Sequence, residues 1–189
     1  TLAAMFLHSR GELDMTKTLG HYLPELTTTN KGGILLKDLL AHEAGLKAFI
    51  PHYTKTMRSG KWNPSYYTNS SSQEFTLPVS NEMFAKPSLR DSLWKWTVNS
   101  DLLPKPHGYV YSDLTMYFMQ EVIERIVGQP LDEFVDQNFY APLGLESLTF
   151  KPFEKMPLSR IAPTEKDVIF RGRQIQGYVH DPGAAMYGG

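Results

Sequence analysis

The sequence predicts an α+β fold that is mostly helical, and two observations carry this prediction. Apolar residues recur at helical spacing in several segments, most clearly between residues 114 and 139. Short runs typical of strands occur instead between residues 149 and 189. Because hydrophobic residues make up 41% of the 189 residues, the chain can bury a real core. We therefore expect a single domain over residues 1–189.

The first half of the chain alternates short helices with irregular segments. Residues 2–9 have helical apolar spacing, and a connector follows over residues 13–26. A second short helix is expected over residues 34–40. Residues 51–88 are rich in Ser, Asn, Thr, Tyr and Pro, so we interpret them as a long surface excursion that acts as a lid. A further helix is expected over residues 89–98.

The strongest helix prediction lies between Asp113 and Gly128. Asp113 is a suitable N-cap, and Gly128 occupies the position where glycine commonly follows a helix. One face of this helix is apolar every fourth residue, at Leu114, Phe118, Val122 and Ile126. A second amphipathic helix should contain Leu131, Phe134, Val135 and Phe139. Short strands and loops are expected from residue 149 to residue 189.

Composition excludes several classes of function. The formal net charge is -1 and the isoelectric point is about 6.6, which gives no basic surface for nucleic acid. The sequence contains no cysteine, so disulfides, thiol catalysis and Cys-ligated metal sites are absent. It also contains no apolar run long enough to cross a membrane.

The segment from Gly108 to Asp113 is the main candidate for chemistry. A β-rich stretch runs into the start of a helix there, with Tyr111 at the junction. A tyrosine is a poor base at its reference pKa of about 10, but a neighbouring ammonium favours the phenolate. A serine nucleophile served by a lysine and a tyrosine uses this chemistry.

Four motifs in order resemble the serine β-lactamase-like family, which includes class C β-lactamases, penicillin-binding proteins and esterases. The family has a G-x-L-x-L connector before Y-L-P, an L-L-T-H-T-S-G-L turn, a Tyr-x-Asn motif and a Pro-Leu-Gly-Met turn. The matching residues are Gly11–Asp14 with Tyr22–Pro24, Leu39–Leu46, Tyr111–Asp113 and Pro142–Leu145.

This resemblance implies an acyl-transfer hydrolase that acts on an amide or ester, such as a peptide or cell-wall-like substrate, without cofactor or metal. Tyr111 would take the proton from the serine, and Asp113 would orient the tyrosine and a lysine. The family also requires Ser-x-x-Lys and a Lys- or His-x-Gly motif. We expect both motifs to lie outside residues 1–189, so that this chain is a truncated β-lactamase-like domain and inactive alone. The resemblance favours the periplasm or cell envelope.

Asp113 departs from the family, which usually has asparagine at this position. An asparagine donates a hydrogen bond to a substrate carbonyl, whereas an ionised carboxylate only accepts. Asp113 would also repel a substrate carboxylate. This difference disfavours efficient β-lactam hydrolysis and leaves ester and peptide acyl transfer open.

Several other residues have structural interpretations that we favour. Ser92 and Lys95 form a literal Ser-x-x-Lys, but it follows the His42 turn, whereas the family places this motif before it. We expect His42 to stabilise its own turn. We expect His180 and Asp181 to belong to a structural loop rather than to a metal site or a catalytic dyad. The aromatic residues Tyr66, Tyr67, Trp94 and Trp96 are expected to serve packing.

A second, softer resemblance concerns residues 170–189. They resemble lactamase-like domains attached to family-3 glycoside hydrolases of the β-N-acetylglucosaminidase type in some bacterial envelope proteins. This resemblance implies an alternative function, in which the domain is a non-catalytic binding or scaffold module of a longer glycosidase.

Overall fold

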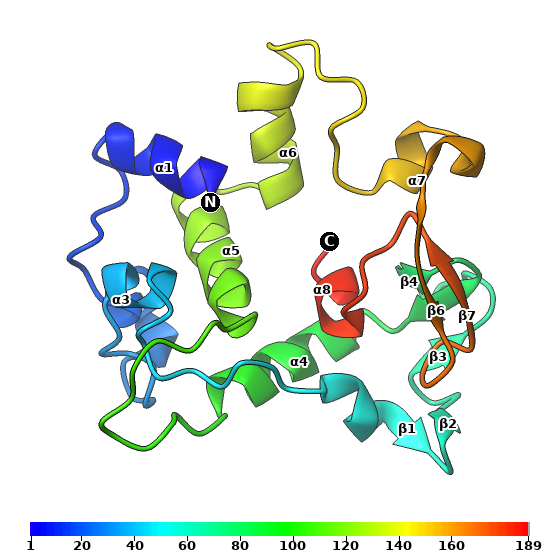
Figure 1. The fold of residues 1–189 in the computed structure, drawn as a ribbon, viewed down its shortest axis with the longest axis horizontal. Coiled ribbons are helices and arrows are strands. Elements are labelled where there is room, and N and C mark those ends of the chain that lie inside the picture. Colours follow the sequence, from blue (N-terminus) through cyan, green and yellow to red (C-terminus); the bar gives the residue numbers. More distant parts are fainter. Residues whose placement is uncertain (189) are drawn as a thin grey trace. The chain divides into compact units, whose positions relative to one another are not determined.

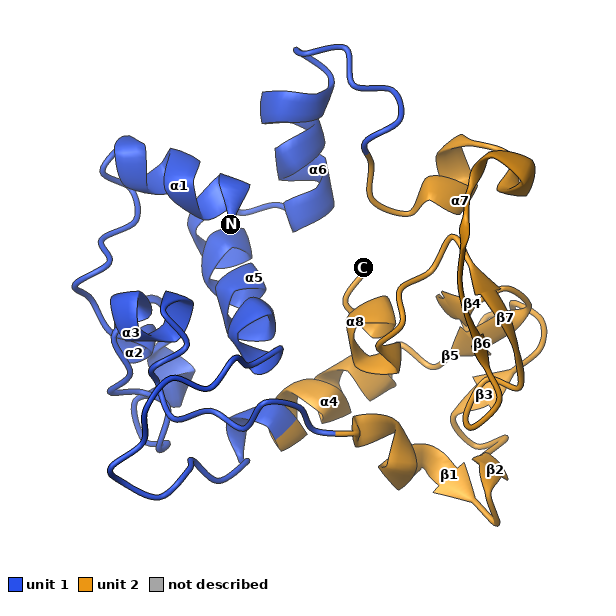
Figure 2. Ribbon diagram, viewed as in Figure 1, with its two compact units in different colours: residues 1–50, 97–148 blue, residues 51–96, 149–189 orange. Residues whose placement is uncertain are grey.

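The computed structural model describes residues 1–188 and contains both helices and strands (Figure 1). Its contacts group into two compact units, each built from two separate parts of the chain (Figure 2). Unit 1 comprises residues 1–50 and 97–148, and unit 2 comprises residues 51–96 and 149–189. The prediction that residues 1–189 form a single domain is not decided by this division into units and stays a prediction.

Unit 1 is helical and is organised around its longest helix. Its helices are α1 (Leu2–Ser9), α2 (Leu19–Tyr22), α3 (Leu36–Leu40), α5 (Leu114–Val127) and α6 (Leu131–Val135), with a 3₁₀ turn at Pro24–Leu26 and a π-helical turn at Asp136–Tyr140. α5 contacts α1, α2 and α6. The core consists of leucines in or next to the short helices and of apolar residues of α5, including Leu7, Leu19, Leu23, Leu36, Leu39, Phe118 and Val122.

Helix α5 forms where its apolar spacing predicts it. The side chains of Leu114, Phe118 and Val122 are buried on one face, which faces the helices of unit 1. Gly128 ends the helix in the left-handed conformation at φ 70°, and its N–H donates to the carbonyl of Glu124. A residue without a Cβ adopts this conformation at little cost, which confirms the predicted glycine stop.

The predicted capping role of Asp113 is wrong. Asp113 stands immediately before the first residue of α5, but its side chain makes no capping hydrogen bond. Its backbone is already helical, at φ -63° and ψ -29°, whereas a capping side chain normally needs an extended backbone. The first turn of α5 is closed instead by backbone bonds from the N–H groups of Thr115 and Met116.

Unit 2 contains the strands. The hairpin of β1 (Met57–Arg58) and β2 (Lys61–Trp62) precedes a three-stranded antiparallel sheet in the order β3 (Tyr67–Thr68), β5 (Met83–Ala85) and β4 (Leu77–Ser80). The hairpin of β6 (Pro163–Asp167) and β7 (Arg173–Gln176) lies in the predicted C-terminal strand region. The remaining elements are 3₁₀ helices at His52–Thr56 and Leu158–Arg160, α7 (Pro152–Lys155), α8 (Pro182–Met186) and α4 (Ser88–Val98), whose last two residues belong to unit 1.

The interpretation of residues 51–88 as a surface excursion is wrong. This segment supplies strands β1–β5, and Tyr67, Val79, Met83 and Ala85 are buried. The strands are two to four residues long, so alternation of apolar and polar residues cannot show in the sequence. The segment therefore forms much of the core of unit 2 rather than a lid.

Candidate functional site

Tyr111 lies three residues before the start of α5, with its side chain 56% exposed. The expected β-rich segment before it is wrong, because residues 108–112 form no strand. Single hydrogen bonds hold the segment to the loop after α3 instead: the Val110 N–H donates to the His42 carbonyl and the Asp113 N–H donates to the Ala48 carbonyl, each at 3.0 Å. The phenol therefore sits on backbone that is fixed on both sides.

The loop after α3 turns sharply at His42. His42 has φ 57°, a left-handed conformation that is uncommon for a residue other than glycine. Its N–H donates to the Leu39 carbonyl at 3.1 Å, and the Glu43 N–H donates to the Asp38 carbonyl at 2.8 Å. The backbone of His42 thus stabilises its own turn, as predicted. Its side chain, however, contacts a different segment of unit 1.

The His42 imidazole contacts the segment that carries Tyr111. The Ser112 N–H donates to His42 Nδ1 at 3.2 Å, and Thr115 Oγ1 lies 3.3 Å from the same nitrogen. The His42 and Tyr111 rings lie with centroids 4.5 Å apart, and the Tyr109 ring meets the imidazole edge-on at 6.1 Å. These contacts join the α3 loop to the start of α5.

Ser112 reinforces this junction from inside the unit. Its side chain is buried, and its hydroxyl donates to the Lys47 carbonyl at 2.7 Å. Thr115 is also buried, and its hydroxyl donates to the Leu39 carbonyl at 3.3 Å. Both hydroxyls therefore bond to the backbone of α3 and of the loop that follows it, which makes them structural groups.

Gly45 allows the loop to pack against its neighbour. It has φ 69°, and a Cβ at this position would lie 2.6 Å from the His107 ring. Both the backbone conformation and the close approach of His107 therefore require glycine here. The Leu103 N–H donates to the Gly45 carbonyl at 2.8 Å, so the segment leading to Tyr111 is anchored at a second point.

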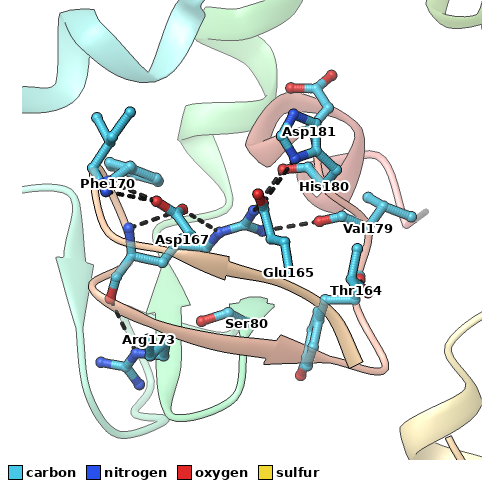
Figure 3. Close-up of polar contacts among 12 residues, drawn as sticks. Ser80, Thr164, Glu165, Asp167, Phe170, Arg173, Val179, His180 and Asp181 are labelled. Atoms are coloured by element: carbon cyan, nitrogen blue, oxygen red, sulfur yellow. Dashed lines mark hydrogen bonds and ion pairs between the residues drawn. The ribbon is translucent and has the colours of Figure 1, made fainter. Parts of the chain in front are cut away.

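A second group of charged residues lies in unit 2, where Arg171 pairs with Glu165 and Asp167. Figure 3 shows Glu165 and Asp167 with the neighbouring His180. The guanidinium is fully buried and bonds to Asp167 Oδ2 at 2.9 Å, to Glu165 Oε1 at 3.1 Å, and to the carbonyls of Val179 and His180. Burial alone would raise the pKa of Asp167, but hydrogen bonds from the Phe170 N–H and from Arg171 outweigh it and hold that pKa below its usual range. We call these residues the Arg171 cluster.

The Arg171 cluster connects the β6–β7 hairpin to the segment before α8. The guanidinium nitrogens Nε, Nη1 and Nη2 all donate to protein acceptors. A buried charge that is paired and hydrogen-bonded in this way is a structural arrangement. It leaves the guanidinium engaged with the protein rather than directed at a ligand.

His180 and Asp181 have separate structural contacts, in line with the favoured interpretation. The Asp181 carboxylate accepts hydrogen bonds from the N–H groups of Gly183 and Ala184, at 2.8 and 3.1 Å, and so caps α8. His180 Nδ1 lies 2.8 Å from Glu165 Oε1 while 79% of its side chain is exposed. Within residues 1–188, no group of three or more His, Cys, Asp or Glu side chains is arranged to hold a metal ion.

The Ser-x-x-Lys sequence at Ser92 lies inside α4, in unit 2. The Ser92 hydroxyl donates to the Ser88 carbonyl at 3.1 Å, one turn earlier in the same helix. Tyr67, by contrast, is a core residue, and its hydroxyl lies 2.8 Å from Thr56 Oγ1. These contacts agree with structural roles for both residues.

The model of the Beta-lactamase family matches residues 1–178. The chain belongs to the β-lactamase family. An Escherichia coli K12 protein provisionally named a D-alanyl-D-alanine carboxypeptidase is 25% identical over 183 residues, which cover 93% of this chain and 36% of that protein. An N-acetylmuramyl-L-alanine amidase of Bacillus subtilis is 25% identical over 192 residues, covering 93% of this chain and 38% of the amidase.

This member of the β-lactamase family also shares its fold with solved structures. A β-lactamase/D-alanine carboxypeptidase from Yersinia pestis superposes with a TM-score of 0.57 at 20% sequence identity, over 97% of this chain and 44% of that chain. The fold is therefore the α+β fold of β-lactamases and transpeptidases. The chain spans less than half the length of each of these three proteins.

The sequence predicts Tyr111 as a site residue, but no pattern in it marks the residues that hold Tyr111. Ser112 and Thr115 are a small hydroxyl pair near a helix start, which in a sequence suggests capping rather than a tertiary contact. The link from His42 to residues 111–115 spans about 70 residues of chain, and no local pattern marks it. The family resemblance placed both motifs in order without indicating that they touch.

Proposed function

We propose that this chain is part of a β-lactamase-like serine hydrolase that transfers an acyl group from an amide or ester through a Ser/Lys/Tyr centre. The observation that carries the proposal is the exposed phenol of Tyr111 on a segment held at Val110 and Asp113. Its position in the Tyr-x-Asn-like motif of a β-lactamase family member supports it. The names of the two curated relatives denote cleavage of an amide bond, which is the same chemical class.

In the proposed reaction, Tyr111 first accepts a proton from the serine and then donates it to the leaving group. The phenolate takes the proton of the serine hydroxyl as the serine oxygen forms a bond to the substrate carbonyl carbon. The tyrosine then donates that proton to the leaving nitrogen or oxygen as the carbon–leaving-group bond breaks. Water repeats the attack on the acyl-enzyme and releases the acid. The serine and a lysine that favours the phenolate would come from a part of the protein outside residues 1–189.

Asp113 would set the preference among substrates. Its carboxylate follows Tyr111 by two residues and would orient the lysine and the tyrosine, but it would repel a substrate carboxylate. We therefore propose that neutral esters or uncharged amides are better substrates than lactams that carry a carboxylate. Replacement of Asp113 by asparagine would then raise kcat/KM for carboxylate-bearing amides relative to neutral esters.

The decisive test is Tyr111→Phe in a full-length protein that contains this chain. We expect kcat/KM for an activated ester to fall on the order of 100- to 10,000-fold, because the hydroxyl supplies acid–base catalysis. The melting temperature should change little, because the ring and its contact with His42 remain. Tyr109→Phe is the matched control, since Tyr109 is also exposed and also contacts His42, and it should leave kcat/KM unchanged.

Unchanged kcat/KM in Tyr111→Phe would remove Tyr111 from the mechanism. That result would favour the alternative, a non-catalytic lactamase-like module attached to a glycoside hydrolase. The sequence of the full-length protein separates the two in a second way. A Ser-x-x-Lys motif before Thr1 agrees with the enzyme, whereas its absence together with a glycosidase domain agrees with the module.

A further inference from the structure

We propose that His42 is a positioning residue for Tyr111, acting through the Ser112 amide rather than through contact with substrate. This inference rests on the proposed role of Tyr111. His42 is the point where the loop after α3 meets the segment before α5, and it makes both a backbone and a side-chain contact with that segment. The hydroxyls of Ser112 and Thr115 also join the two segments, but the His42 side chain is the one that contacts both the Ser112 amide and the Tyr111 ring.

The hydrogen bond from Ser112 defines the state of the imidazole. Since the Ser112 N–H donates to Nδ1 at 3.2 Å, Nδ1 carries no proton, and the proton of the neutral ring lies on Nε2. The Ser112 amide directly follows the carbonyl of Tyr111 in the chain. The bond therefore fixes the peptide plane on the C-terminal side of Tyr111, while the Val110–His42 backbone bond fixes the preceding residue.

The ring of His42 also limits the side chain of Tyr111. The two ring centroids are 4.5 Å apart with an interplanar angle of 42°. A phenol that packs on an imidazole has fewer accessible rotamers than one that is free in solvent. His42 thus holds both the backbone and the ring of Tyr111, and a catalytic group displaced by about 1 Å can lose on the order of 100-fold in rate.

The left-handed backbone of His42 allows two informative substitutions. Asparagine and glycine both tolerate φ 57°, so neither introduces a new backbone cost at this position. His42→Asn keeps an acceptor oxygen close to the position of Nδ1, whereas His42→Gly removes the acceptor and the ring together. The pair therefore separates loss of the acceptor from a change of backbone conformation.

The experiment measures kcat, KM and amide hydrogen exchange in the full-length protein. We expect His42→Gly to lower kcat about 10- to 100-fold with little change in KM, and to speed exchange of the Ser112 amide at least about tenfold. His42→Asn should restore Ser112 protection and most of kcat. Ser59→Gly is the matched control, because Ser59 also has a left-handed backbone, at φ 52°, on an exposed turn of unit 2. It should change neither quantity.

The outcomes distinguish this inference from the proposed function. If Tyr111→Phe slows acyl transfer but His42→Gly keeps full kcat, the positioning role is wrong and the function of Tyr111 stands. If both His42 variants lose kcat equally, the acceptor does not matter and the inference also fails. If His42→Gly does not fold, the wild-type protein still decides, because an unprotected Ser112 amide there would contradict the proposed hydrogen bond.

Discussion

At the scale of single residues, His52 is the buried titratable group with the clearest consequence for stability. Its side chain is only 3% exposed, next to the Trp96 ring. Burial, and to a smaller extent the charge of Lys55, lower the pKa of His52 to about 4, although Asp181 acts in the opposite direction. The folded protein therefore holds His52 neutral at a pH where an unfolded chain, with a histidine pKa of about 6.5, already binds a proton.

This difference predicts a loss of stability in acid. As the pH falls from about 6.5 toward 4, the unfolded state gains a proton that the folded state does not, so the free energy of unfolding decreases. His52→Phe removes the titrating group and keeps a ring of similar size. We expect the melting temperature of the wild type to fall relative to that of the variant as the pH falls through this range. Above pH 6.5, the difference between the two melting temperatures should stay constant.

The same comparison has an internal control. His21→Phe replaces an exposed histidine on α2. It therefore controls for the effect of removing one histidine from the unfolded chain. Parallel melting-temperature curves for the wild type and His52→Phe between pH 6.5 and 4 would contradict the assignment of this acid sensitivity to His52.

At the scale of elements, the Arg171 cluster determines how the β6–β7 hairpin is held in unit 2. Arg171→Met removes the buried cation and leaves Asp167 without its ion-pair partner, whereas Glu165 keeps its contact with His180. Breaking a buried ion pair on one side typically costs about 3–5 kcal/mol, because the remaining charge is uncompensated. We expect a loss of that order in the free energy of unfolding.

Urea unfolding followed by tryptophan fluorescence measures this effect in unit 2, which contains the Arg171 cluster. The three tryptophans, Trp62, Trp94 and Trp96, all belong to unit 2. Arg160→Met is the control, because Arg160 is exposed, and it should change the free energy of unfolding by less than about 0.5 kcal/mol. An equally small effect of Arg171→Met would show that the cluster contributes little to stability.

At the scale of the whole molecule, we predict that residues 1–189 alone form no acyl-enzyme. Their one Ser-x-x-Lys sequence begins at Ser92, whose hydroxyl donates within its own helix. Incubation with a chromogenic lactam or an activated ester, followed by intact-mass spectrometry, should show no covalent adduct. The full-length protein, treated in the same way, is the positive control. A stable adduct on Ser92 would contradict both this prediction and the structural interpretation of α4.

Sequence patterns by themselves determined the long elements and their order along the chain. The four-residue apolar spacing and the glycine at position 128 were sufficient for α5, because a helix is stabilised by contacts between residues close in sequence. The order of four motifs was sufficient for the family. Strands β1–β5 were not predictable, because each is too short to show a period and becomes stable only through pairing with residues brought together by folding.

The candidate site divides in the same way. The motif predicts Tyr111 as the reactive group, and only the tertiary structure placed His42 against the Tyr111 ring and the Ser112 amide. It likewise assigned the start of α5 to backbone turns instead of the Asp113 side chain. Such contacts join residues about 70 positions apart, and their energies depend on distances that exist only once the loop after α3 and the start of α5 have packed together.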